Sequence, residues 1–215
     1  MARQRRLYLA GYSYHLVHRG HNRQAIFHEP SDYIRYQDYL LDALLRYGVV
    51  CHAYVQMSNH VHLLLSPSCS DGISRVMSLL GNRYVRHFNR LYQRSGGLWE
   101  NRHFSCAVHT DRYLWACYRY IELNPVRAQL APDAESYYWS SYRCNALHDM
   151  DELVTPHPCW LGLGRSDQQR SDAYRSMFLR HRHADDFSEI RRATRRGLTL
   201  ENIHGPMPPV VPITP

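Results

Sequence analysis

The hydrophobic and polar positions of this chain recur with two periods. Runs that alternate and are rich in aromatic and β-branched residues predict strands, whereas apolar residues at every third or fourth position predict amphipathic helices. In chain order the pattern predicts a strand over 11–20, a helix over 31–48, strands over 49–57 and 60–66, a helix over 71–94, a strand over 103–109 and a helix over 112–123.

Polar and glycine residues between these runs predict where the elements begin and end. Ser31 is the predicted N-cap of the first helix, and Gly48 is its predicted stop. The two residues Ser58 and Asn59 suit a tight hairpin between the second and third strands. The helix over 112–123 is expected to be capped by Thr110 or the following aspartate.

The order strand, helix, strand, strand, helix, strand predicts an α+β fold with a ferredoxin-like antiparallel sheet and helices packed on one face. After about residue 145 a loop-like passage over 155–164 precedes two short helical patterns, over 167–180 and 185–196. We therefore predict three parts: a domain over 1–145, a small helical C-terminal extension over 146–200, and a proline-rich tail over 201–215 that we expect to be disordered.

The net charge of +7 belongs to the first two thirds of the chain. Residues 1–145 hold 17 arginines against 10 acidic residues, whereas residues 146–215 hold 9 against 9. There is no lysine, so every cation is a guanidinium that can bind phosphate with two hydrogen bonds or stack on a base. A GC-rich genome would also explain the missing lysine, but it does not explain the uneven distribution, which favours a polyanionic partner.

The apolar runs are too short to cross a bilayer, and the arginine-rich start lacks the apolar stretch of a secretion signal. The six cysteines fit no Cys-x-x-Cys spacing, so reduced thiols are favoured over disulfides. We therefore expect a soluble cytoplasmic protein without a membrane partner.

His60 and His62 stand one residue apart in an apolar run that predicts a strand. Alternate side chains on a strand share a face, so the two imidazoles point to the same side and can bind one cation. In a chain with fifteen histidines, however, such a pair can also arise by chance.

Tyr120 and Asn124 are four residues apart in a predicted helix, so a phenol and an amide lie one above the other. Two other interpretations remain open. Asn124 before Pro125 is typical of a helix N-cap, and Tyr120 is one of seventeen tyrosines that could serve packing alone.

Five segments together make the chain recognisable: "YHLVHRGHNRQAIF", "AYVQMSNHVHLLLSP", "LWENRHF", "YRYIELNPVRA" and "YYWSSYR". They resemble the REP-associated tyrosine transposases of bacteria, relatives of the single-tyrosine HUH transposases. The resemblance runs from about Gly11 to Tyr142, with Asn101 and His103 standing where many members have Gly and Tyr.

This resemblance implies a divalent metal, Mg or Mn, bound by His60, His62 and Asn124, with Tyr120 as the catalytic nucleophile. It implies a single-stranded DNA endonuclease and strand-transferase that acts on REP-type hairpins, through a covalent 5′-phosphotyrosine, as a monomer. The only acidic candidates near these motifs for activating Tyr120 are Glu100 and Glu122.

Such a substrate needs contacts to phosphates and stacking on unpaired bases. The DNA-binding candidates are Arg19, Arg23, Arg83, Arg86, Arg90, Trp99 and Arg102. Each arginine could instead be a solvated surface residue, and Trp99 could belong to the core.

Two other functions remain open. One is a catalytically silent protein that binds REP hairpins in a regulatory or nucleoid role. The other is a metal-dependent hydrolase of a small substrate, which the cationic first domain and the lack of a carboxylate base beside the histidines disfavour.

Overall fold

The computed structural model describes residues 8–180 together with residues 190 and 192. Four strands form one antiparallel sheet in the order β2-β3-β1-β4. The strands are β1 (Ser13–Arg19), β2 (Val49–Met57), β3 (His60–Pro67) and β4 (Phe104–Val108). This order confirms the predicted ferredoxin-like α+β fold.

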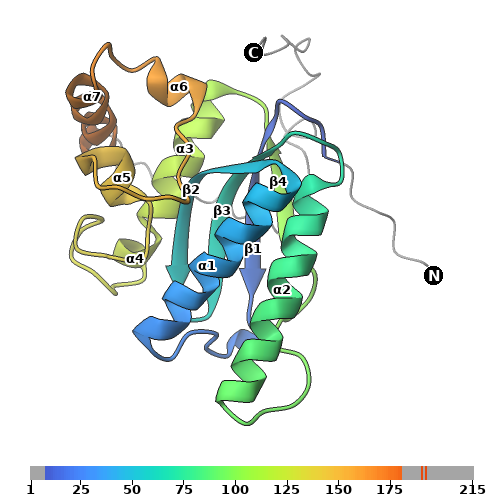
Figure 1. Cartoon of the computed structure of the whole chain (residues 1–215). Coiled ribbons are helices and arrows are strands. Elements are labelled where there is room, and N and C mark those ends of the chain that lie inside the picture. The colour runs from blue at the N-terminus through green and yellow to red at the C-terminus, as the bar shows by residue number, and fades with distance from the viewer. Residues whose placement is uncertain (1–7, 181–189, 191, 193–215) are drawn as a thin grey trace.

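The predicted packing of helices on one face holds for the two long helices, whereas an extra helix covers the other face. The long helices α1 (Pro30–Tyr47) and α2 (Gly72–Leu91) lie side by side on one face, as Figure 1 shows. The extra helix α3 (Asp111–Glu122) packs on the other face. Side chains alternate along β1, so Leu16 joins the core under α1 and α2, whereas His15 contacts Tyr120 of α3.

Four short helices and one longer helix, α7, complete the described part of the chain. They are η1 (His21–Arg23), α4 (Asn124–Arg127), α5 (Tyr142–Leu147), α6 (Pro158–Leu161) and α7 (Asp167–Arg180). Helix α7 confirms the helical pattern over 167–180, whereas α6 lies in a passage expected to be a loop. The predicted helix over 185–196, apart from residues 190 and 192, and the predicted tail lie outside the described residues.

The prediction of Ser31 as the cap of the first helix is wrong. Helix α1 begins one residue earlier, at Pro30, and its N-cap is Glu29. Asp32 Oδ2 accepts hydrogen bonds from the backbone N–H groups of His28 and Glu29, at 2.8 and 3.2 Å. Proline fits the first helical position because its φ suits the helix and its missing N–H needs no partner there.

Two other predicted boundaries are confirmed. Gly48 ends α1 in the left-handed conformation, with φ of 59°, where a glycine avoids the strain of a side chain. Thr110 caps α3, because its Oγ1 accepts a hydrogen bond from the backbone N–H of Tyr113 at 3.2 Å. The cap fixes the start of the helix that carries Tyr120.

Residues 139–141 return to the sheet and pair with the margin of β2. The backbone N–H of Gln56 donates to the carbonyl of Trp139 at 2.9 Å, and that of Ser141 donates to Tyr54 at 3.0 Å. Helix α5 follows at once and spans residue 145, where the sequence places a domain boundary. That division remains a prediction, and the hydrogen bond from Tyr174 to Glu122 crosses it.

No helix in the described part of the chain is both long enough and apolar enough to cross a membrane.

Candidate active site

His60 and His62 lie on β3 with their ring centroids 5.0 Å apart. The antiparallel register places Arg19 opposite His60 and Val17 opposite His62 on the neighbouring strand β1. All four residues line one cavity of about 670 Å³. The predicted sharing of a face by the two imidazoles is therefore observed.

A polar neighbour engages one nitrogen of each imidazole. His60 Nδ1 donates to Asn59 Oδ1 at 2.6 Å, and His62 Nδ1 lies 2.9 Å from His15 Nε2. Hydrogen bonds of this kind fix the tautomer and the ring orientation of histidines that bind metals. Both rings are thereby left with Nε2 as the nitrogen for a cation.

Burial keeps these rings neutral. Burial, together with a smaller contribution from the positive charge of Arg19, lowers the pKa of His60 to about 4. Burial also lowers the pKa of His62 well below its ordinary value, with smaller contributions from His60, His15, Arg19 and Arg127. Because a metal binds the neutral imidazole, this environment favours ligation over protonation.

Tyr120 lies beside these imidazoles in the same cavity. Its ring centroid is 5.4 Å from that of His62 and 5.7 Å from that of His15, with the planes nearly perpendicular. The Arg127 guanidinium lies over the tyrosine ring, 5.0 Å from its centroid. Tyr120 is thus placed next to the histidine pair, as the motifs predict, although its side chain is only 5% exposed.

Asn124 lines the cavity as well. Its Nδ2 donates to the backbone carbonyl of Tyr120 at 2.9 Å, so the four-residue spacing is maintained across the end of α3. The alternative interpretation of Asn124 as an N-cap is wrong, because Asn124 is the first residue of the short helix α4 and the N-cap is Leu123. The amide therefore stabilises the helix end through its nitrogen, while its oxygen is not used in that bond.

The donor set fits a divalent cation bound by few protein ligands. Among the described residues, no three His, Cys, Asp or Glu side chains cluster in a way that could hold a metal. A cation here would instead be bound by His60, His62 and the Asn124 oxygen, with water or phosphate oxygens completing the shell. Because all three groups are neutral, the cation would keep its full charge for a phosphate.

The predicted DNA-binding residues fall into separate groups. Arg19 and Arg23 line the site cavity. Trp99 and Arg102 line a second cavity of about 720 Å³ beside α2. Trp99 stacks on His18 with centroids 3.8 Å apart, so the core interpretation of this residue is partly correct.

The three arginines of α2 differ in their contacts. Arg83 pairs with Asp42 of α1, and Arg86 donates to the carbonyl of Asn82 one turn earlier at 3.2 Å. Arg90 is exposed. None of the three lines the site cavity, so a role in DNA binding remains a prediction for them.

Sequence reasoning missed three residues of the site: Asn59 and Arg127, which line the cavity, and His15, which contacts His62 without lining it. His15, Asn59 and Arg127 all lie in the recognisable segments, and alternation along β1 could have placed His15 on the same side as Arg19. Of the two acidic candidates, Glu100 lines the cavity, whereas Glu122 is fully buried and does not line it.

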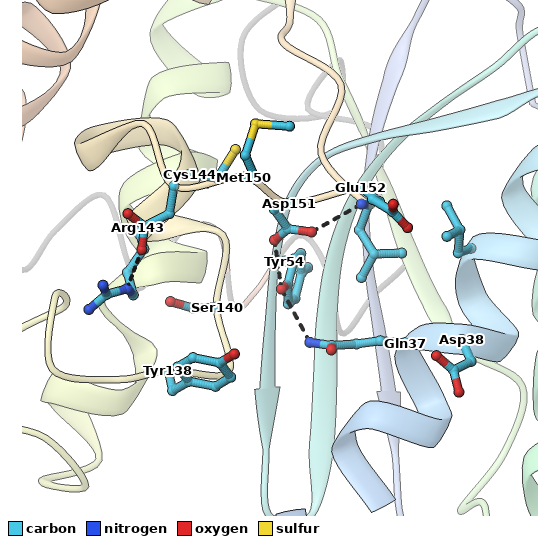
Figure 2. A pocket seen from close by; sticks show the side chains of 13 residues that line it. Gln37, Asp38, Tyr54, Tyr138, Ser140, Arg143, Cys144, Met150, Asp151 and Glu152 are labelled. Carbon is cyan, nitrogen blue, oxygen red and sulfur yellow. Dashed lines mark hydrogen bonds and ion pairs between the residues drawn. The ribbon is translucent and has the colours of Figure 1, made fainter. Parts of the chain in front are cut away.

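A smaller cavity, of about 280 Å³, lies between α1, β2 and the segment after α5 (Figure 2). Asp38, Arg143 and Asp151 are among its lining residues. It contains none of the predicted site residues.

Comparisons with known proteins agree with this geometry. The family model described as "Transposase IS200 like" matches residues 8–124, which include His60, His62, Tyr120 and Asn124. A search among curated proteins finds no match.

Two solved structures are similar to this chain. One, described as the REP-associated tyrosine transposase bound to a REP hairpin, has a TM-score of 0.56 and 16% identity, and the match covers 73% of this chain and 93% of that one. The other, a putative transposase from Deinococcus radiodurans, has a TM-score of 0.38 and 24% identity, and covers 60% of this chain and 92% of that one. The first likeness supports the same fold.

Proposed function

Because the chain belongs to the IS200-like transposase family, we propose that it is a metal-dependent single-stranded DNA endonuclease and strand-transferase that acts on REP-type hairpins. The observation that carries this proposal is the convergence of Tyr120 with His60 and His62 in one cavity. A phenol beside two neutral imidazoles has no evident structural purpose, whereas phosphodiester cleavage uses a nucleophile next to a cation.

In the proposed reaction, the Tyr120 oxygen attacks the scissile phosphorus and loses its proton. The bond between phosphorus and the 3′ oxygen breaks, and that oxygen gains a proton and leaves as a free hydroxyl. The 5′ phosphate stays joined to Tyr120, so the energy of the broken bond is conserved for rejoining. A bound Mg or Mn would polarise the phosphate and stabilise the charge that develops on it.

The cavity arginines suit the substrate. Arg19, Arg23 and Arg127 surround the site, where they would neutralise the phosphates on either side of the scissile bond. Trp99 and Arg102 in the second cavity would contact bases or phosphates farther along the strand. The hairpin itself is proposed because one protein of similar fold is described as bound to a REP hairpin.

The test is covalent capture. A labelled REP oligonucleotide is incubated with the protein and Mn, and the products are separated under denaturing conditions. The wild-type protein should form an adduct, and Tyr120→Phe should form none. Tyr118→Phe is the matched control, because this tyrosine is on the same helix and is also buried but does not line the cavity.

An adduct that survives Tyr120→Phe would overturn the assignment of the nucleophile. Hairpin binding by the wild-type protein without any adduct would favour the catalytically silent binding protein. Cleavage of a nucleotide or ester that EDTA abolishes, without action on the hairpin, would favour the small-substrate hydrolase.

A further inference from the structure

Glu122 connects the helix that carries Tyr120 to the C-terminal part of the chain. It is 0% exposed and accepts three hydrogen bonds, from Ser141 Oγ at 2.6 Å, Asn145 Nδ2 at 2.9 Å and the Tyr174 hydroxyl at 2.6 Å. Two residues after Tyr120, it is turned by about 200° around the helix axis. The carboxyl group therefore holds α3 from the side opposite the cavity.

The same partners are fastened to the sheet. Ser141 Oγ accepts from the backbone N–H of Tyr54 at 2.9 Å, and Asn145 Nδ2 also reaches the carbonyl of His52 at 3.2 Å. The Tyr54 hydroxyl, in turn, donates to Asp151 at 2.8 Å, as Figure 2 shows. Strand β2 and α3 are thus linked by one buried network.

Tyr174 extends the network to helix α7. Its side chain is 0% exposed, and its ring packs edge-on against Tyr118 of α3, with centroids 5.7 Å apart. Ser141, Asn145 and Tyr174 all lie beyond the residues matched by the family model. We call these three residues, together with Glu122, the C-terminal brace.

We propose that the C-terminal brace sets the position of Tyr120 relative to His62, with Glu122 as the positioning residue. This inference rests on the proposed role of Tyr120 as nucleophile. Displacing a reacting group by about 1 Å can slow a reaction on the order of 100-fold. Loss of the brace would therefore slow the reaction by letting α3 and Tyr120 move, although no brace residue contacts the substrate. The "YYWSSYR" segment, which the reaction itself does not use, supplies Ser141 to this brace.

The variant Glu122→Gln separates positioning from catalysis as a base. A glutamine oxygen can still accept from Ser141 and Asn145, and its amide can donate to the Tyr174 oxygen. Positioning therefore predicts adduct formation within about twofold of wild type, because the brace stays whole. If Glu122 were instead the general base, its replacement by glutamine would slow the reaction by about 100-fold or more.

The variant Tyr174→Phe removes one bond of the brace and keeps the ring. At saturating hairpin and Mn, we expect adduct formation about tenfold slower with a Kd for the hairpin within about twofold of wild type. Amide hydrogen exchange in α3 should also become faster, which is a readout that needs no activity.

Tyr84→Phe is the matched control. Tyr84 is also 0% exposed, and its hydroxyl donates a single 2.6 Å hydrogen bond, to the Ile26 carbonyl under α1 and α2. Tyr84→Phe should lose about as much stability as Tyr174→Phe, while its rate of adduct formation and its amide exchange in α3 stay as in wild type.

Equal adduct rates and equal α3 exchange in Tyr174→Phe and Tyr84→Phe would overturn the inference. If Tyr174→Phe does not fold, Ser141→Ala tests the same network from the residue that precedes α5. Absence of an adduct in the wild-type protein would contradict the proposed function instead, and hydrogen exchange would still decide whether the brace holds α3.

Discussion

At the scale of residues, the site depends on how each imidazole is oriented by a neighbour. His15 stacks on His62, with ring planes 10° apart and Nε2 directed at Nδ1 of His62. It does not line the cavity itself, so any effect it has on the site passes through His62. Asn59 does the same for His60 from the hairpin between β2 and β3.

Replacing His15 by phenylalanine should weaken Mn binding by about 10–100-fold, because His62 would lose the partner that fixes its tautomer. Isothermal titration of the protein with Mn measures this. His18→Phe is the control, since His18 lies on the same strand but faces α2 and stacks on Trp99. Unchanged Mn affinity in His15→Phe would show that His15 does not orient His62 for metal binding.

Glu122 gives the protein a pH-dependent stability. Burial raises the pKa of this carboxyl to about 7, and the hydrogen bonds from its three partners oppose part of that rise. The folded state therefore holds a proton that the unfolded state releases near pH 4.5. Its contribution to stability is complete below that pH and is lost as the pH rises through about 7.

Glu122→Gln cannot lose this proton, so its melting temperature relative to wild type should rise between pH 5 and pH 8. The difference in the free energy of unfolding between the two proteins should change by about 2–3 kcal/mol over this range, because the pKa of Glu122 is about 7 in the folded state and 4.5 in the unfolded state. Thermal melts of both proteins across this range measure it. A difference that does not vary with pH would mean that Glu122 titrates normally.

At the scale of elements, the start of α1 depends on one buried carboxylate. Asp32 Oδ2 accepts from the backbone N–H groups of His28 and Glu29 and from the Tyr92 hydroxyl of the segment after α2, the last at 2.7 Å. The helix start and the end of the α2 segment are thereby joined at one point.

Asp32→Ala should lower the free energy of unfolding by about 1–3 kcal/mol, because it leaves the backbone N–H groups of His28 and Glu29 without their acceptor. Chemical denaturation measures the loss. Asp38→Ala on the same helix is the control, since its ion pair with Arg35 is exposed and should contribute less than about 1 kcal/mol. Equal losses of unfolding free energy in the two variants would show that Asp32 does not stabilise the start of α1.

The elements that sequence could predict are those whose signal is local. Alternation and helical spacing place β1 to β4 and α1 to α3, and Gly48 and Thr110 mark ends through their own backbone chemistry. Ser31 misleads because a preferred cap residue stands directly after Pro30, which itself suits the first turn. The pattern does not say which of two neighbouring starts is used.

Contacts between distant segments could not be predicted. The four-residue spacing of Tyr120 and Asn124 predicts that they lie on the same side of the helix. The hydrogen bond between Tyr174 and Glu122, in contrast, joins residues 52 positions apart. Likewise, the pairing of His15 with His62 depends on strand register, which the linear pattern does not specify. Family resemblance supplied the site residues, whereas the brace emerged only from the fold.

At the scale of the whole molecule, the arginine surplus should govern DNA binding through salt. Neutralising a phosphate releases condensed counterions, so the affinity for a hairpin should fall steeply as salt rises. The arginines that touch DNA are distinguished from the others by their share of this slope.

Arg23→Gln should reduce the slope of log affinity against log salt by about 1, because Arg23 lines the site cavity. Arg175→Gln should leave the slope unchanged, since Arg175 of α7 pairs with Asp172 away from the cavity. Fluorescence anisotropy with a labelled hairpin at several salt concentrations measures both. A slope that Arg23→Gln does not alter would place the DNA elsewhere.

The backbone of residues 139–141 occupies the margin of the sheet along β2. An unpaired strand invites a strand from another molecule, which is a common beginning of aggregation. On this side the chain has supplied its own partner, and within the described residues the opposite margin is formed by β4, which is only 5 residues long. Pairing of copies edge to edge through this sheet is thereby discouraged, so the fold opposes one route to self-association without any residue devoted to it.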